Sequence, residues 1–134
     1  MRALLDILKT MNSGWKVEHI NDVPPMKEGM SQGWKSVRWH MDIESFGVNA
    51  VTKPKDEWLT PVHDEANEKQ DELFLVVEGV AEFNLDGKKI KAKPGTLVSA
   101  KPHVKRGAIS LKTPTTILII GSPIGEVYKP VSWA

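Results

Sequence analysis

The sequence contains no cysteine, which excludes disulfide bonds, thiolate metal sites and cysteine nucleophiles. It also lacks any apolar run that is long enough to cross a bilayer. Near the start of the chain, Asp6 and Lys9 interrupt the apolar stretch that a signal peptide requires. We therefore expect a cytoplasmic protein with no membrane partner.

The signature motifs of several enzyme classes are absent as well. The chain has no glycine-rich phosphate loop, no His-Glu-x-x-His zinc motif and no nucleophile beside a recognisable base. Its 134 residues, of which 40% are hydrophobic, are typical of a single globular domain.

Acidic residues are missing from one long stretch, between Asp86 and Glu126. That stretch nevertheless carries eight basic residues: Lys88, Lys89, Lys91, Lys93, Lys101, Lys105, Arg106 and Lys112. A basic face can attract nucleic acid, but no nucleic-acid-binding motif accompanies it. Lysines on the solvent side of strands also hinder edge-to-edge pairing, so we expect no nucleic-acid partner.

Residues 1–43 predict an extension that precedes the main domain. A helix is predicted over residues 2–12, because apolar side chains recur at the spacing of one helical face: Leu4, Ile7, Leu8 and Met11. Residues 15–20 predict a short edge strand, residues 21–33 a loop, and the alternation over residues 34–41 another strand.

A series of short strands with turn signals between them is predicted in the rest of the chain: 46–52, 73–77, 80–85, 89–92, 96–100, 107–111 and 116–120. Asp86-Gly87 is a strong hairpin signal, since both central positions of this turn favour a positive φ. Such a series predicts an all-β sandwich or barrel.

The strand predicted over residues 73–77 is apolar on both faces. Phe74 and Val76 share a side with Glu72, and the alternate residues Leu73, Leu75 and Val77 face the other way. A barrel has only one interior face, so the other face needs a cover. The N-terminal helix or a second subunit could supply it, and we expect a homodimer.

Two segments resemble the two sequence motifs of the cupin family. The first cupin motif is Gly, five residues, His-x-His, three or four residues, Glu, six residues and Gly. Glu72 and Gly79 match its second half, His63 matches its first His if the spacer is longer, and Glu65 replaces its second His. The second motif is Gly, five residues, Pro-x-Gly, two residues, His, three residues and Asn. Its Gly is matched by Gly95, whereas its later positions hold Lys101, His103, Arg106 and Ser110.

The resemblance covers about residues 44–129 and implies a single-domain cupin β-barrel, a jelly roll, with a short N-terminal helix. It places the extension at residues 1–43, the barrel core at 44–129 and a tail at 130–134. The segment Gly121-Ser122-Pro123, with Tyr128 and Trp133, is similar to the end of some single-domain cupins.

The resemblance also implies that the metal site is degenerate. Metal-binding cupins hold one ion with three histidines and a glutamate, but Arg106 stands at one histidine position and has no lone pair for a metal. We expect Arg106 to pair with Glu72 in place of a metal. His63, Glu65, Glu72 and Arg106 are then the candidate binding residues for a small molecule, with Arg106 favouring an anionic one, and no cofactor is required.

Other interpretations of the same residues stay open. A metal-dependent dioxygenase or isomerase could use His63, Glu65 and Glu72 to bind Fe, Mn, Ni or Zn. The two carboxylates could also act as an acid–base pair, or the chain could be a structural dimer with a filled barrel. Arg106 could instead lie on the solvated rim, and His103 is expected at the surface. Three tryptophans could line the mouth of a pocket or belong to the core: Trp34, Trp39 and Trp58.

Overall fold

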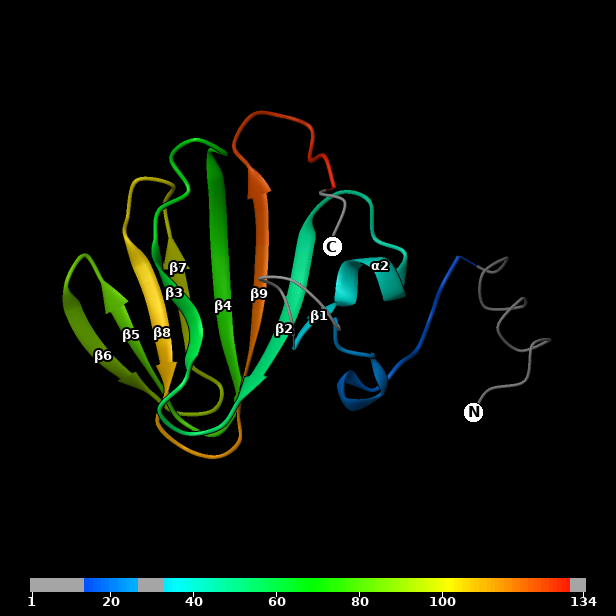
Figure 1. Ribbon diagram of the computed structural model, residues 1–134. Helices are drawn as coiled ribbons and strands as arrows, with labels where there is room; N and C mark the ends of the chain where they lie inside the picture. The colour runs from blue at the N-terminus through cyan, green and yellow to red at the C-terminus, as the bar shows by residue number, and fades with distance from the viewer. Residues whose placement is uncertain (1–13, 27–32, 131–134) are drawn as a thin grey trace.

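The structure, a computed structural model, describes residues 14–26 and 33–130. Two antiparallel sheets face each other and form an all-β jelly roll (Figure 1). The five-stranded sheet has the order β1 (Trp34–Ser36), β2 (Gly47–Lys53), β9 (Thr115–Pro123), β4 (Gln70–Glu78) and β7 (Leu97–Ala100). The four-stranded sheet has the order β3 (Trp58–His63), β8 (Arg106–Ser110), β5 (Ala81–Leu85) and β6 (Lys88–Ala92). The prediction of an all-β fold is confirmed, and β3 is a strand that the sequence patterns did not predict.

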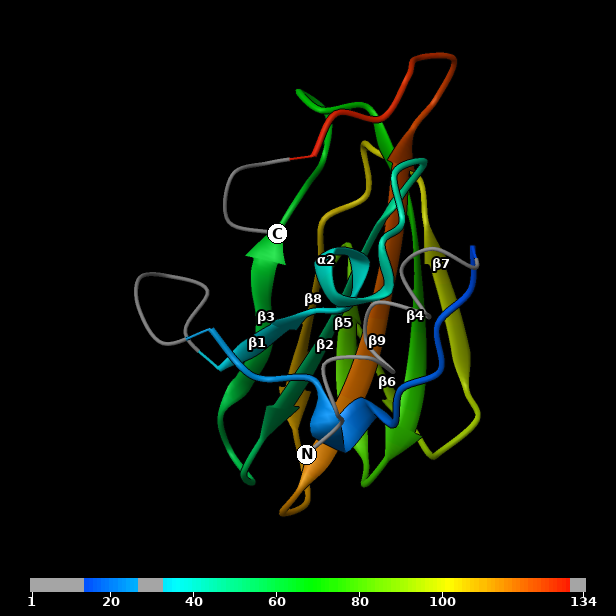
Figure 2. The same cartoon turned by 90° about the vertical axis from the view of Figure 1, so that its right-hand side faces the viewer.

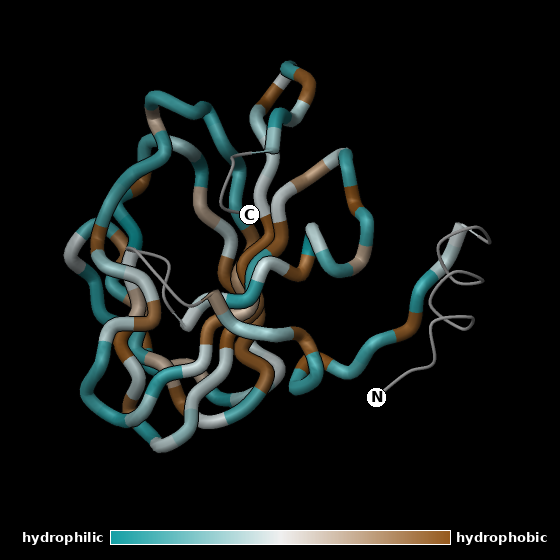
Figure 3. Tube along the Cα trace, turned by 45° about the vertical axis from the view of Figure 1, so that its right-hand side comes forward, coloured by the Kyte–Doolittle hydropathy of each residue, from teal (hydrophilic) through white to brown (hydrophobic). Residues whose placement is uncertain are grey.

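The space between the sheets holds one apolar core. Phe74 of β4 meets Phe83 of β5 edge to face, with ring centroids 5.5 Å apart. The predicted alternation of β4 is confirmed, since Phe74 and Val76 are buried whereas Leu73 is only partly buried. Hydrophobic residues collect where the strands pass through the centre of the barrel, and the long loops are mostly hydrophilic (Figure 3).

The predicted hairpin at Asp86-Gly87 joins β5 to β6. Both turn residues adopt positive φ, 51° at Asp86 and 89° at Gly87, as the sequence predicted. The Gly87 amide also donates a hydrogen bond of 2.8 Å to Asn84 Oδ1, which closes the turn.

The strands predicted near the N-terminus are largely wrong. Residues 15–20 form no strand, and Ile20 is already the first residue of a 3-10 turn, η1 (Ile20–Asp22). The strand predicted over residues 34–41 stops at Ser36, where the Ser36 hydroxyl accepts the Trp39 amide at 3.3 Å and begins α2 (Val37–Met41). The helix predicted over residues 2–12 lies outside the described residues.

The short helix α2 packs against β2 and lies over the outer face of the five-stranded sheet (Figure 2). Within the part of the chain that the structure describes, no helix has the length and apolar character needed to cross a membrane.

Candidate functional site

A cavity of about 360 Å³ opens between the two sheets at the end of the barrel where β4 begins. Residues from β1, β2, β3, β4 and β9 line it, together with the segments that follow β3 and β9. The lining combines three carboxylates, an imidazole and an ammonium group with amide, hydroxyl and aromatic groups: Glu65, Glu68, Glu72, His63, Lys129, Asn49, Gln70, Thr60, Tyr128, Trp34 and Phe74. We call this space the mouth cavity.

His63 is the last residue of β3, and the irregular register of this strand sets its position. The β3–β8 pairing shifts between Thr60 and His63, after which His63 lies opposite Arg106. A side chain at residue 107 would collide with this path, because a Cβ on Gly107 would lie 2.8 Å from the Val62 backbone nitrogen. The bulged strand and the glycine facing it therefore bring His63 to the mouth cavity.

Both ring nitrogens of His63 face oxygen atoms. Nδ1 lies 2.8 Å from the Pro61 carbonyl oxygen, and Nε2 lies 2.9 Å from Glu65 Oε1. A carbonyl and a carboxylate only accept hydrogen bonds, so this geometry favours the imidazolium form, in which both nitrogens donate. The hydrogen bond to Glu65 accordingly raises the pKa of His63, although partial burial opposes the shift.

Arg106 and Glu72 form a second ion pair deeper in the barrel. Arg106 is 0% exposed, and its Nη1 donates to Glu72 Oε1 at 3.1 Å, while its Nη2 donates to the Lys101 carbonyl at 2.6 Å. The predicted pairing of Arg106 with Glu72 is confirmed, and the alternative position on the rim is wrong. Arg106 does not line the mouth cavity, so a ligand there would meet Glu72 and not the guanidinium.

Glu72 is a carboxyl group of the cavity whose pKa lies near neutral pH. Its side chain is only 10% exposed. Burial and the neighbouring Glu65 carboxylate raise the pKa of Glu72 to about 7, against the opposing effects of Arg106 and His63. Glu72 can therefore accept or donate a proton at the floor of the cavity.

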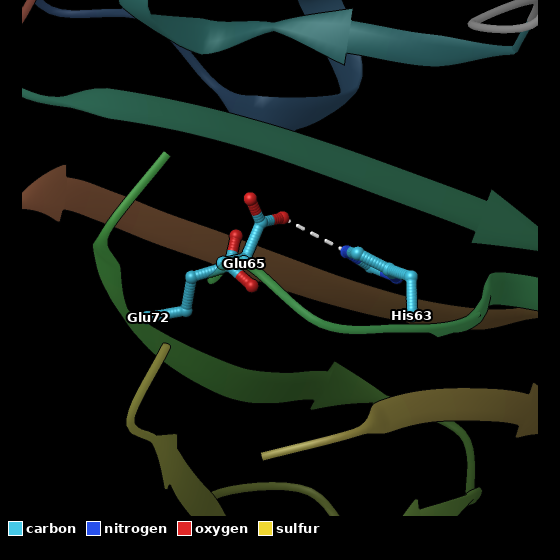
Figure 4. Close-up of side chains that lie close together, drawn as sticks. All are labelled: His63, Glu65 and Glu72. Carbon is cyan, nitrogen blue, oxygen red and sulfur yellow. Dashed lines mark hydrogen bonds and ion pairs between the residues drawn. The ribbon is translucent and has the colours of Figure 1, made fainter. Parts of the chain in front are cut away.

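Three of the predicted site residues converge, as Figure 4 shows for His63, Glu65 and Glu72. One donor atom from each lies within 4.8 Å of the others. One imidazole and two carboxylates form a donor set that suits a transition metal with open positions. The three residues thus fit a metal ion, provided that His63 Nε2 gives up its proton.

The sequence patterns missed several residues of the cavity lining. Asn49 of β2 is the clearest case, since its Oδ1 is buried and has no hydrogen-bond partner among the described residues. The sequence did indicate its position, because residues two apart in a strand lie on the same face. Asn49 therefore shares a face with the core residue Val51. Tyr128 packs close to Gly47, where an added Cβ would lie 3.0 Å from the tyrosine hydroxyl oxygen.

Among Trp34, Trp39, Trp58 and His103, one residue lines the cavity and the other three are exposed. Trp34 lines the mouth cavity, whereas Trp39 and Trp58 are exposed and lie outside its lining. His103 is exposed, as expected.

Comparison with known proteins finds the fold among solved structures. No protein-family model matches the sequence, and no curated protein matches it. An RmlC-like cupin from Desulfovibrio desulfuricans is 21% identical, with a TM-score of 0.63 over 81% of this chain and 97% of that one. A cupin protein from Bacteroides fragilis is 18% identical, with a TM-score of 0.60 over 84% and 93%. A sugar phosphate isomerase of the cupin superfamily from Silicibacter pomeroyi is 16% identical, with a TM-score of 0.63 over 80% and 75%. At these identities the comparisons show the fold, and that fold is the cupin jelly roll.

Proposed function

We propose that this cupin-fold protein binds a small, hydroxyl-rich molecule in the mouth cavity and does so without a tightly held transition metal. The observation that carries the proposal is the charge balance of the cavity floor. His63 pairs with Glu65 at 2.9 Å, and Arg106 pairs with Glu72 at 3.1 Å. Glu65 and Glu72 therefore each have a cation of their own, so these two carboxylates need no metal charge to balance them.

The lining favours a ligand that donates hydrogen bonds. Glu65 and Glu72 offer carboxylate oxygens, and Asn49 offers a carbonyl oxygen that no described residue satisfies. A volume of about 360 Å³ lies at the small end of ordinary ligand sites. Hydroxyl groups suit these acceptors, whereas a phosphate or carboxylate on the ligand would face three carboxylates, Glu65, Glu68 and Glu72, and one lysine, Lys129. This argues against the anionic ligand that Arg106 suggested in the sequence.

One similar structure carries the name sugar phosphate isomerase. The sugar part of such a substrate agrees with the acceptor-rich lining here, and the phosphate part does not. Glu72, with a pKa of about 7, is the candidate group for any proton transfer to a bound ligand.

A metal-dependent enzyme is the second candidate, and the convergence of His63, Glu65 and Glu72 within 4.8 Å favours it. A divalent ion there would polarise a substrate oxygen or activate a bound water. Glu72 would keep its hydrogen bond from Arg106, and the His63–Glu65 contact would break as His63 loses its proton.

Titration calorimetry with Mn²⁺, Ni²⁺ and Zn²⁺ separates the two candidates, alongside elemental analysis of the purified protein. We expect no stoichiometric metal in either experiment. A site of submicromolar affinity that disappears in His63→Ala would establish the metal-dependent candidate instead.

The ligand class is tested by the change in melting temperature with neutral sugars and polyols and with their phosphorylated forms. We expect the neutral compounds to stabilise the protein and the phosphates not to do so. Asn49→Leu keeps the number and branching of the side-chain heavy atoms but removes the free carbonyl oxygen, so it should abolish the shift. Stabilisation by the phosphates alone would contradict the proposed ligand class.

A further inference from the structure

Strand β6 forms one edge of the four-stranded sheet. β5 pairs with it on one side, and no other described strand pairs with it on its second side, at the left of Figure 1. An edge strand presents unpaired backbone N–H and C=O groups, which are a template for a further strand. The open side of β6 is therefore a surface that another polypeptide can extend.

The hairpin geometry determines which backbone groups of β6 point outward. The two-residue turn makes Leu85 and Lys88 a hydrogen-bonded pair, and such pairs occur at every second position of an antiparallel ladder. Ile90, two residues further along, therefore also bonds to β5. Lys89 and Lys91 consequently direct their backbone N–H and C=O groups away from the sheet.

Exposed lysines follow this edge from the Asp86-Gly87 turn to the end of the strand: Lys88, Lys89, Lys91, Lys93 and Lys105. None of the five forms an ion pair with a residue that the structure describes. Two acidic residues lie beside them, Glu82 opposite Lys91 and Asp86, whose Oδ1 accepts the Lys105 amide at 2.9 Å. Five cations and two carboxylates leave the edge with an excess of positive charge.

One apolar side chain lies between the lysines of β6. Ile90 is 38% exposed and shares a face with the buried Ala92, whereas Lys89 and Lys91 lie on the opposite face of the strand. Residues directly opposite each other in neighbouring strands lie on the same face. A strand that suits this edge thus has an apolar residue opposite Ile90 and acidic residues on either side of it.

We propose that β6 binds an extended acidic segment of another protein, in which acidic and apolar residues alternate, as an additional strand of the four-stranded sheet. The backbone groups of Lys89 and Lys91 hydrogen-bond to this segment, and the lysine side chains pair with its carboxylates. Main-chain hydrogen bonds supply affinity in this mode of recognition, and alternate side chains supply specificity.

The same features disfavour other partners. The β6 edge of a second copy would bring like charges together, which destabilises cross-strand pairs. A single-stranded nucleic acid would match the charge, but its binding proteins combine a basic groove with aromatic side chains on which bases stack. The exposed tryptophan of this sheet, Trp58, lies on β3 at the opposite edge. An open strand edge beside the charge favours a polypeptide.

Fluorescence anisotropy with a labelled six-residue peptide, in which glutamate and valine alternate, tests the proposal. The wild-type protein should bind this peptide, and Lys89→Glu and Lys91→Glu should each weaken binding on the order of tenfold, because each reverses a charge at the edge. Lys55→Glu is the matched control, since Lys55 is exposed on the turn between β2 and β3 and its substitution changes the net charge equally. It should leave the affinity unchanged.

Two further probes, both used with the wild-type protein, separate strand addition from attraction between charges. The same peptide with N-methylated glutamate amides keeps its carboxylates but lacks the N–H groups opposite Lys89 and Lys91, so it should not bind. A single-stranded oligonucleotide of equal charge should bind more weakly than the unmodified peptide. Equal binding of the methylated peptide or of the oligonucleotide would overturn the proposal, and so would a lack of binding of the unmodified peptide at millimolar concentration.

Discussion

At the residue scale, the buried pair of Arg106 and Glu72 determines the character of the mouth cavity. Arg106 cannot lose its proton, and burial with the Glu65 carboxylate nearby raises the pKa of Glu72 to about 7. Arg106 therefore keeps Glu72 at least partly ionised in a place where an isolated carboxyl group would be neutral. The cost of removing Arg106 then depends on how easily Glu72 takes up a proton.

Replacing Arg106 with methionine should destabilise the protein by about 3–5 kcal/mol at pH 8, since Glu72 is then buried without its cation. The loss should be smaller at pH 5, because the unpaired carboxyl group becomes neutral there. Urea unfolding of Arg106→Met at the two pH values measures the difference.

The double variant Glu72→Gln with Arg106→Met should lose much less free energy of unfolding than the two single variants lose in sum. Lys101→Met is the control, because it breaks an exposed pair with Asp71 and should cost about 0–1 kcal/mol. If the losses of unfolding free energy in the two single variants add up to the loss in the double variant and do not depend on pH, the two charges are not coupled.

At the scale of elements, the contact between β3 and β8 determines the position of His63. The bulged β3 strand passes so close to β8 that Gly107 has no room for a side chain. His63 and Arg106, one from each ion pair of the cavity, lie opposite each other at the end of this contact. The packing of two strands therefore sets the distance between the two ion pairs.

Gly107→Ala should destabilise the protein by about 1–3 kcal/mol, because a Cβ at 2.8 Å from the Val62 backbone forces β3 away from β8. The same displacement should move His63 and weaken ligand binding in the mouth cavity. Thermal unfolding and the ligand-induced shift of the melting temperature measure the two effects. Ser99→Ala on the exposed face of β7 is the control, and equal behaviour of the two variants would contradict the close β3–β8 contact.

The elements differ in how well the sequence predicts them. Asp86-Gly87 was predicted correctly because its backbone requirement is local and lies within the turn itself. Residues 37–41 were assigned to a strand, since their alternation cannot reveal that the Ser36 hydroxyl caps a helix. Residues 15–20 have strand-forming side chains, but among residues 14–26 and 33–130 no strand pairs with them, and a strand needs a neighbouring strand to form.

The sequence likewise predicted some residues of the candidate site and missed others. The motif spacing located His63, Glu65, Glu72 and Arg106, and the ion pair between Arg106 and Glu72 followed from their charges. Asn49 was missed because a single polar residue in a strand is typical of a solvent-facing position. Its place on the inner face depends on the register of β2 with β9.

At the scale of the whole molecule, the raised pKa of Glu72 should appear in the pH dependence of folding. The folded protein keeps a proton on Glu72 up to about pH 7, whereas the unfolded chain releases it near the ordinary value of 4.5. Folding stability should therefore fall as the pH rises through this window, by up to about 3 kcal/mol. The raised pKa of His63 acts in the same direction, because its favourable charge is lost as the pH rises.

Glu72→Gln isolates this contribution, since all other titrating groups remain. The free energy of unfolding should fall less between pH 5 and pH 8 in Glu72→Gln than in the wild-type protein. Equal slopes for the two proteins would mean that Glu72 has an ordinary pKa in the fold.

The position of Arg106 also constrains how this chain can evolve. A histidine at residue 106 would come closer to the metal-binding pattern, but the first step removes the cation from a buried carboxylate. Losing about 3–5 kcal/mol of unfolding free energy removes a large part of the roughly 5–15 kcal/mol by which a typical domain is stable. Descendants of this sequence should therefore change residues 72 and 106 together or leave both unchanged.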